Sequence, residues 1–161
     1  PPRSTLFPYT TLFRSIGRAE FVGHFREKVG FRGGDEEFVA IWRSVFSANG
    51  PMVDFWRSMA GGRADVWYFS NTGEMHVPWV YEAFPGMAVH RGHALSYELG
   101  VMKPDPAFFR RGLGRLGLDP AECLFIDDQA ANYEAARACG IESIHYTEAP
   151  SALAALRARL A

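Results

Sequence analysis

The sequence has few cysteines, almost no net charge and no long hydrophobic run. Its 161 residues include two cysteines, Cys123 and Cys139, too few for the dense disulfide framework of a small secreted scaffold. A formal net charge of -1 gives no general attraction to nucleic acids or to membrane surfaces. No apolar stretch approaches the roughly 20 residues that a membrane-spanning helix needs. These absences predict a cytoplasmic protein with neither a nucleic-acid nor a membrane partner.

What the sequence does contain is enough hydrophobic material for a sizeable core, at 48% of its residues. A chain of this length can form one domain, or one core with a small cap. The part from residue 16 to residue 62 has apolar residues at helical spacing. It predicts three helices, over residues 19–29, 35–46 and 52–59.

From Val66 onward, short strand-like runs alternate with helical ones. Strands are predicted at residues 66–69, near 94–95, at 124–126 and at 143–145, and helices at 77–84, 107–116, 130–139 and 151–160. Alternation of this kind indicates a parallel sheet with helices on both faces. The predicted fold class is therefore α/β.

Two adjacent acids, Asp127 and Asp128, follow the apolar run Leu124-Phe125-Ile126. The carboxyl end of a buried parallel strand is the place where α/β folds bind ligands. Two neighbouring carboxylates repel each other, and a divalent cation with a preference for oxygen ligands would relieve that repulsion. A solvated Asp-Asp turn is the alternative, and it would be favoured if the pair stood alone.

Two further polar segments occupy comparable positions. The run Val66-Trp67-Tyr68-Phe69 ends in Ser70-Asn71-Thr72, whose side chains can donate hydrogen bonds to an anion, although an ordinary turn has the same composition. Lys103 stands in Lys103-Pro104-Asp105-Pro106, directly before the helix predicted at 107–116. The three segments occur in a fixed order, which rarely arises by accident: a strand followed by Ser-Asn, then Lys-Pro, then a strand followed by Asp-Asp.

These segments resemble motifs II, III and IV of the haloacid dehalogenase-like (HAD) hydrolase superfamily. The pattern is most similar to the glucose-1-phosphatase-like branch with a small cap, in which a nearby histidine, here His76, follows Ser-Asn-Thr. In that branch the third motif reads Ser-x-x-x-Gly-x-x-Lys-Pro, matched here from Ser96 to Pro104. The resemblance extends from about Gly17 to Thr147.

The resemblance implies a three-layer, Rossmann-like parallel sheet with a small helical cap. It also implies a Mg²⁺-dependent phosphomonoester hydrolase of the sugar-phosphate type that acts through an aspartyl-phosphate on a small phosphorylated metabolite. By the same resemblance, Asp127 and Asp128 would bind the Mg²⁺ cofactor. Asn132, in the following helix, would hydrogen-bond the loop that carries these acids.

The resemblance implies that the remaining site residues bind the substrate and its phosphate group. Lys103 would offset the negative charge of the phosphate and of the nucleophile. Ser70 and the backbone around Asn71 would hold a phosphoryl oxygen in the transition state. His76 would contact a substrate hydroxyl, and packing or solvation at the start of a helix is an equally good interpretation of this residue.

The first family motif, an Asp-x-Asp that supplies the nucleophile and the general acid, occurs nowhere in the 161 residues. Residues 1–15 instead resemble the translated sequence of a sequencing adapter. We therefore expect an N-terminally truncated, inactive chain without the central motif I strand. The expected organisation is a non-native segment at 1–15, a remnant of the cap and linker helix at 16–62, and a HAD-like core at 63–161.

The sequence leaves two alternatives with the same fold, one catalytic and one not. A haloacid dehalogenase shares the aspartate ester chemistry but needs no metal, and the pair Asp127-Asp128 argues against it. A non-catalytic protein that keeps the fold for metal or partner binding would also lack motif I. A receiver domain of a two-component system also uses paired acids and a lysine. Its acid pair comes early in the chain, whereas Asp127 and Asp128 follow Lys103 here, so the order of the residues argues against a receiver domain.

Overall fold

The computed structural model describes residues 18–44, 46–59, 64–74, 76–88 and 90–160. The segment 1–15, predicted to be non-native, lies outside these residues, as do Val45 and residues 60–63. The described elements are, in chain order, α2 (Arg18–Val29), α3 (Asp35–Arg43), α4 (Gly50–Met59), β1 (Trp67–Ser70), α5 (Val77–Ala83), the 3₁₀ helix η2 (Pro85–Ala88), β2 (Gly92–Leu95), α6 (Ser96–Leu99), α7 (Pro106–Leu116), η3 (Pro120–Glu122), β3 (Leu124–Asp127), α8 (Ala130–Ala138), β4 (Glu142–His145) and α9 (Ala149–Leu160).

The strands form two parallel pairs, which confirms the predicted α/β class. Strand β1 pairs with β2 so that Ser70 lies opposite Leu95, and β3 pairs with β4 so that Asp127 lies opposite His145. Within the residues that the structure describes, no ladder of hydrogen bonds joins β1 to β3. The two pairs are held together by side chains instead.

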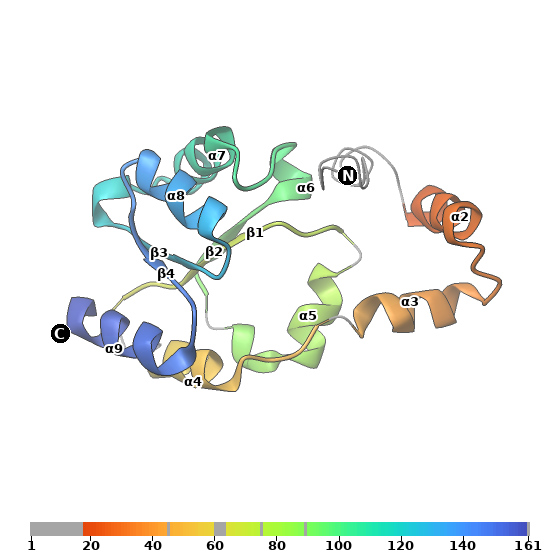
Figure 1. Ribbon diagram of the computed structural model, residues 1–161, viewed down its shortest axis with the longest axis horizontal. Coiled ribbons are helices and arrows are strands. Elements are labelled where there is room, and N and C mark those ends of the chain that lie inside the picture. The colour runs from red at the N-terminus through yellow and green to blue at the C-terminus, as the bar shows by residue number, and fades with distance from the viewer. Residues whose placement is uncertain (1–17, 45, 60–63, 75, 89, 161) are drawn as a thin grey trace.

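Helices cover both faces of the strands, which gives three layers (Figure 1). Alternate residues of a strand point to opposite faces. In β3, Phe125 packs on one side in a cluster centred on Phe108 and Phe109 of α7 and Ala136 of α8. Its neighbours Leu124 and Ile126 pack on the other side, against α4 and α9.

Helix α7 comes very close to the first strand pair at Gly112. A methyl group added at Gly112 would lie 2.7 Å from the ring of Phe69 in β1 and 2.9 Å from Cβ of Ala94 in β2. The absence of a side chain at Gly112 therefore allows the helix to seat directly on these strands. This close packing fixes the helix that follows Lys103 relative to the strand that ends in Ser70.

Helices α2 and α3 lie to one side of the strands (Figure 1) and have a small core of their own. Val22 and Phe38 are buried there, with Phe25 and Phe31 packed around them. The prediction that the second helix extends to Phe46 was wrong, because α3 ends at Arg43. Ser44 is responsible: its hydroxyl donates a hydrogen bond to the Ile41 carbonyl, and serine competes with the helix backbone in this way.

Helix α4 begins at Gly50, two residues earlier than the sequence predicts. Pro51 falls in the first turn, where a proline costs no hydrogen bond, and the Asn49 side chain accepts one from the Met52 N–H. The helix packs on α9, with Met52, Phe55 and Leu156 buried between them. None of the helices in the described ranges is both long and apolar enough to cross a bilayer.

Candidate active site

The polar residues singled out in the sequence gather where the strands end. Ser70 is the last residue of β1, and Asp127 is the last residue of β3. Lys103 lies in the loop between α6 and α7, next to a cis Lys103–Pro104 peptide bond. Strand β1 is parallel to β2, and β3 is parallel to β4. Lys103 contacts both Asn71, after β1, and Asp127, in β3, so the ends of the two pairs form one candidate site of the kind expected in an α/β fold.

A buried ion pair between Lys103 and Asp127 forms the centre of the site. Nζ of Lys103 lies 2.5 Å from Oδ2 of Asp127, and the two side chains are only 9% and 7% exposed. The ammonium group also lies 5.3 Å from the centre of the Phe125 ring. A buried charge needs a partner of this kind, since leaving it alone in a poorly hydrated environment is costly.

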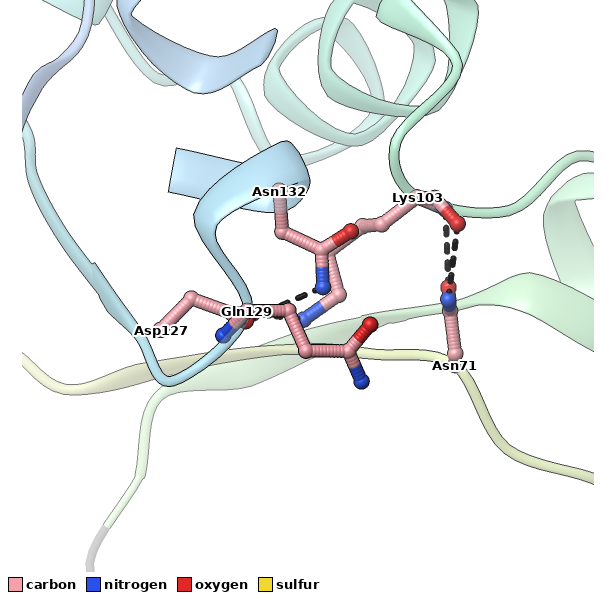
Figure 2. A network of polar contacts seen from close by, with 5 residues as sticks. All are labelled: Asn71, Lys103, Asp127, Gln129 and Asn132. Carbon is pink, nitrogen blue, oxygen red and sulfur yellow. Dashed lines mark hydrogen bonds and ion pairs between the residues drawn. The ribbon is translucent and has the colours of Figure 1, made fainter. Parts of the chain in front are cut away.

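The carboxylate of Asp127 has two further donors (Figure 2). Its Oδ1 accepts hydrogen bonds from the Gln129 N–H, at 2.9 Å, and from Nδ2 of Asn132, at 3.0 Å. The predicted contact of Asn132 with the acid loop is therefore present. Burial alone would raise the pKa of Asp127, but the hydrogen bond and charge of Lys103, with the Gln129 and Asn132 bonds, hold that pKa below its ordinary value.

Asn71 is bound to the backbone of Lys103 through both ends of its amide (Figure 2). Its Nδ2 donates to the Lys103 carbonyl at 2.9 Å, and its Oδ1 accepts from the Lys103 N–H at 2.8 Å. Nearby, the Ser96 hydroxyl donates to the Thr72 carbonyl and accepts from the Thr72 N–H, both at 3.0 Å. The side chain of Asn71 therefore positions the backbone of Lys103.

We expect Asn71→Ala to lower the free energy of unfolding by about 1–3 kcal/mol, because two hydrogen bonds to the Lys103 backbone are lost. Urea denaturation measures this. Gln129→Ala is the matched control, because the described contact of Gln129 is made by its backbone N–H, and it should change stability by no more than about 0.5 kcal/mol. Equal stability of the two variants would show that the amide contact seen here does not hold the loop.

Asp128 differs from Asp127 in being exposed to solvent. Its carbonyl accepts a hydrogen bond from Nε2 of His145 at 3.1 Å. No hydrogen bond or ion pair in the described part of the chain uses the Asp128 carboxylate. Asp127 keeps about one unused lone pair, because three donors occupy a carboxylate that has about four acceptor sites. Both acids thus retain oxygen atoms for a metal ion.

This donor set fits Mg²⁺, although the described residues hold no group of three His, Cys, Asp or Glu side chains that could bind a metal by themselves. Mg²⁺ commonly takes only one or two carboxylates from the protein and completes its octahedron with water and substrate phosphate. Asp128, with support from Asp127, meets that requirement.

His76 packs against two aromatic residues, one in α3 and one that follows it. Its ring stacks on Trp42 at 5.6 Å and meets Phe46 at 4.8 Å, and the residue is 7% exposed. Burial lowers the pKa of His76, the Trp42 backbone opposes this, and the charge of Arg43 lowers it further. The packing interpretation accounts for all of these contacts of His76.

Comparison with known proteins agrees with the geometry of the site. A family model described as haloacid dehalogenase-like hydrolase matches residues 52–140, which include β1, β2, β3 and all of the residues around Lys103. The chain belongs to this family. It is therefore a member of a family of hydrolases, and the predicted HAD-like fold is confirmed.

Solved structures of the family resemble the whole described fold. A HAD family enzyme from Bacteroides thetaiotaomicron superposes with a TM-score of 0.79 at 28% identity, over 90% of this chain and 75% of that one. The wild-type form of that enzyme, in complex with magnesium and inorganic phosphate, gives 0.75 at 29% identity, over 84% of this chain and 72% of the other. A HAD-like family hydrolase from Porphyromonas gingivalis, at 20% identity and a TM-score of 0.75, covers 96% of this chain and 82% of its own and shares the fold.

Curated relatives match shorter stretches. A sesquiterpene phosphatase from Aspergillus oryzae is 33% identical over 89 residues, which are 55% of this chain and 41% of the phosphatase. A chloroplast flavin mononucleotide hydrolase from Arabidopsis thaliana is 38% identical over 52 residues, 32% of this chain and 21% of the hydrolase. The chain thus matches less than half the length of these curated relatives.

Proposed function

We propose that the protein is a Mg²⁺-dependent phosphomonoester hydrolase of the sugar-phosphate type. The observation that carries the proposal is the buried pair of Lys103 and Asp127, with the exposed carboxylate of Asp128 beside it, at the carboxyl ends of parallel strands. The magnesium and phosphate complex of the Bacteroides thetaiotaomicron enzyme and the phosphatase from Aspergillus oryzae support it. The substrate would be a small phosphorylated metabolite.

The residues of this chain would act mainly by neutralising and orienting a phosphate. Asp128 and Asp127 would hold Mg²⁺, which when bound supplies a Lewis acid for the phosphoryl oxygens. Lys103 adds a second positive charge, and Asn71 holds the backbone of this lysine in place. The Ser70 hydroxyl and the backbone at Asn71, at the end of β1, would donate to a phosphoryl oxygen as its charge grows.

The nucleophile of the proposed reaction is not among the 161 residues, which contain no Asp-x-Asp. We therefore propose that the chain as given is inactive, and that hydrolysis through an aspartyl-phosphate requires an added strand with that motif. In the described residues, β1 and β3 each lack a hydrogen-bonded partner on the side away from β2 and β4. This arrangement is compatible with such a strand.

Hydrolysis of a chromogenic phosphomonoester, with Mg²⁺ or with EDTA, tests the proposal on two forms of the protein. One is the chain as given, and the other carries an N-terminal strand with Asp-x-Asp taken from a family member. We expect Mg²⁺-dependent activity in the extended form alone. A panel of sugar phosphates, aryl phosphates and flavin mononucleotide then ranks the substrates.

In the extended form, Asp128→Asn should lower kcat by roughly 10³-fold, because the metal site loses a charge worth several kcal/mol in the transition state. Asp54→Asn is the matched control, since Asp54 is 78% exposed and pairs only loosely with Arg57. Activity in the chain as given would overturn the assignment of the nucleophile. A folded but inactive extended form would favour the non-catalytic alternative.

A further inference from the structure

The end of strand β4 holds the backbone of both acids. The Tyr146 N–H donates a hydrogen bond to the Asp127 carbonyl at 2.8 Å. The next carbonyl, that of Asp128, accepts from Nε2 of His145 at 3.1 Å. Since a carbonyl oxygen can only accept, Nε2 carries the proton in this contact. Two successive peptide groups of the acid loop are thus fixed from one neighbouring strand.

The imidazole that makes the second contact is itself held in place. The ring of His145 stacks on that of Tyr133 in α8, with centres 5.7 Å apart and planes at 27°. One turn further along the same helix, Arg137 lies 5.5 Å from the centre of the Tyr133 ring and donates a hydrogen bond to its hydroxyl at 3.1 Å. Arg137, Tyr133 and His145 therefore form a continuous support from α8 to the Asp128 carbonyl.

The two acids depend on different supports. The carboxylate of Asp127 is fixed directly, by Lys103, Asn132 and the Gln129 N–H. The carboxylate of Asp128 has no such side-chain partner in the described part of the chain, where the contacts of this residue hold its backbone. The Tyr146 N–H fixes the peptide group before Asp128, and His145 Nε2 fixes the one after it by bonding to the Asp128 carbonyl.

We propose that His145 is a positioning residue that aims the Asp128 carboxylate at the Mg²⁺ ion. The inference rests on the proposed function, because it takes Asp128 to be a metal ligand. Residues that orient a metal ligand from outside typically change metal affinity by 10- to 100-fold when they are replaced. In this protein the effect travels through a backbone carbonyl rather than through the ligand's side chain.

Calorimetric titration of the chain with MgCl₂ tests the inference without any need for turnover. His145→Phe keeps the stack on Tyr133 and removes the donor, and we expect it to weaken Mg²⁺ binding about tenfold. His145→Gln, which restores an N–H donor, should bind within about threefold of the unmodified chain. His24→Phe, on the distant helix α2, should bind as the unmodified chain does.

Thermal unfolding in EDTA separates positioning from a merely structural role. A positioning role predicts that His145→Phe leaves the unfolding temperature in EDTA unchanged while the affinity for Mg²⁺ falls. Tyr133→Leu is a second variant that leaves His145 in place but removes its stacking partner, and it should weaken Mg²⁺ binding by a smaller factor. If both variants bind Mg²⁺ as the unmodified chain does, the inference is wrong.

The variant Asp128→Asn distinguishes a failure of the inference about His145 from a failure of the proposed function. Loss of Mg²⁺ binding in Asp128→Asn, with no effect of His145→Phe, would retain the metal role of Asp128 and reject the role of His145. If Asp128→Asn binds Mg²⁺ normally, or if the unmodified chain binds none, the metal assignment fails and the inference about His145 fails with it.

Discussion

Replacing Lys103 by methionine is expected to lower the free energy of unfolding at pH 7 by about 3–5 kcal/mol. The side chains of Lys103 and Asp127 are 9% and 7% exposed, so removing the ammonium group leaves a carboxylate buried without a counter-charge. Domains of this size have a total stability of only about 5–15 kcal/mol, and the loss is therefore a large part of it. Urea denaturation measures the effect.

Two comparisons show whether the unpaired Asp127 carboxylate causes the loss of stability in Lys103→Met. Lys28→Met, at the other lysine of the chain, exposed on α2, should change stability by no more than about 0.5 kcal/mol. Adding Asp127→Asn to Lys103→Met should recover part of the loss, because a neutral amide keeps an acceptor for the Gln129 N–H without the buried charge. Additive effects of the two substitutions would contradict the ion pair as the origin.

The stability that the Lys103–Asp127 ion pair contributes should depend on pH in a defined direction. The pKa of Asp127 in the folded protein is below its ordinary value of 3.8, so the stability that the ion pair contributes is complete above that value. It is lost as the pH falls through the lower, folded-state pKa. In Lys103→Met the lowering by Lys103 is removed while burial still raises the pKa of Asp127, so the variant regains stability as its carboxyl takes up a proton, and the difference in stability between the two proteins should shrink as the pH falls into the acid range.

Substituting alanine at Gly112 and at Gly114, two positions of the same helix, is expected to change stability in opposite directions. At Gly112 the new methyl group would lie 2.7 Å from Phe69 and 2.9 Å from Ala94, both in strands beneath α7. Overpacking of this kind costs about 1–3 kcal/mol, which exceeds the gain of about 0.8–1.0 kcal/mol from replacing glycine in a helix.

Gly114 is the matched control, because nothing lies within 4 Å of an added methyl group there. Gly114→Ala should therefore raise the free energy of unfolding by up to about 1 kcal/mol. Thermal or urea unfolding of the two variants measures the contrast. A stabilising Gly112→Ala would mean that α7 sits further from β1 and β2 than the structure shows.

The order of the motifs placed Asn71, Lys103 and Asp127 in one candidate site, but it did not show which hydrogen bonds each of them makes there. Asp127 lies at a strand end, where an α/β fold is expected to bind ligands, whereas Lys103 lies in the loop between α6 and α7, and only the family resemblance placed it at the same site. The resemblance assigned the backbone around Asn71 to the phosphate, and the structure adds that the Asn71 side chain binds the Lys103 backbone. A sequence gives the donor and acceptor groups of Asn71, whereas the loop conformation decides which of them are already occupied.

Two other features lie beyond the sequence for physical reasons. The contact of His145 with Asp128 spans 17 residues and depends on the register that places Asp127 opposite His145 in β3 and β4. No local pattern encodes such a register. The end of α3 was predicted too late because hydrophobic periodicity continues past Arg43, while the hydroxyl of Ser44 bonds back to the helix and ends it.

The stack of Trp42 on His76 has a consequence for how this protein can be altered. Helices α2 and α3 pack around a hydrophobic cluster of their own, and the aromatic rings of Trp42 and Phe46 meet His76 next to the core. A unit with its own cluster and a small boundary behaves as an exchangeable module. Grafting a different pair of helices at this boundary is therefore expected to leave the ends of the strands, and the pair of Lys103 and Asp127 between them, as they are.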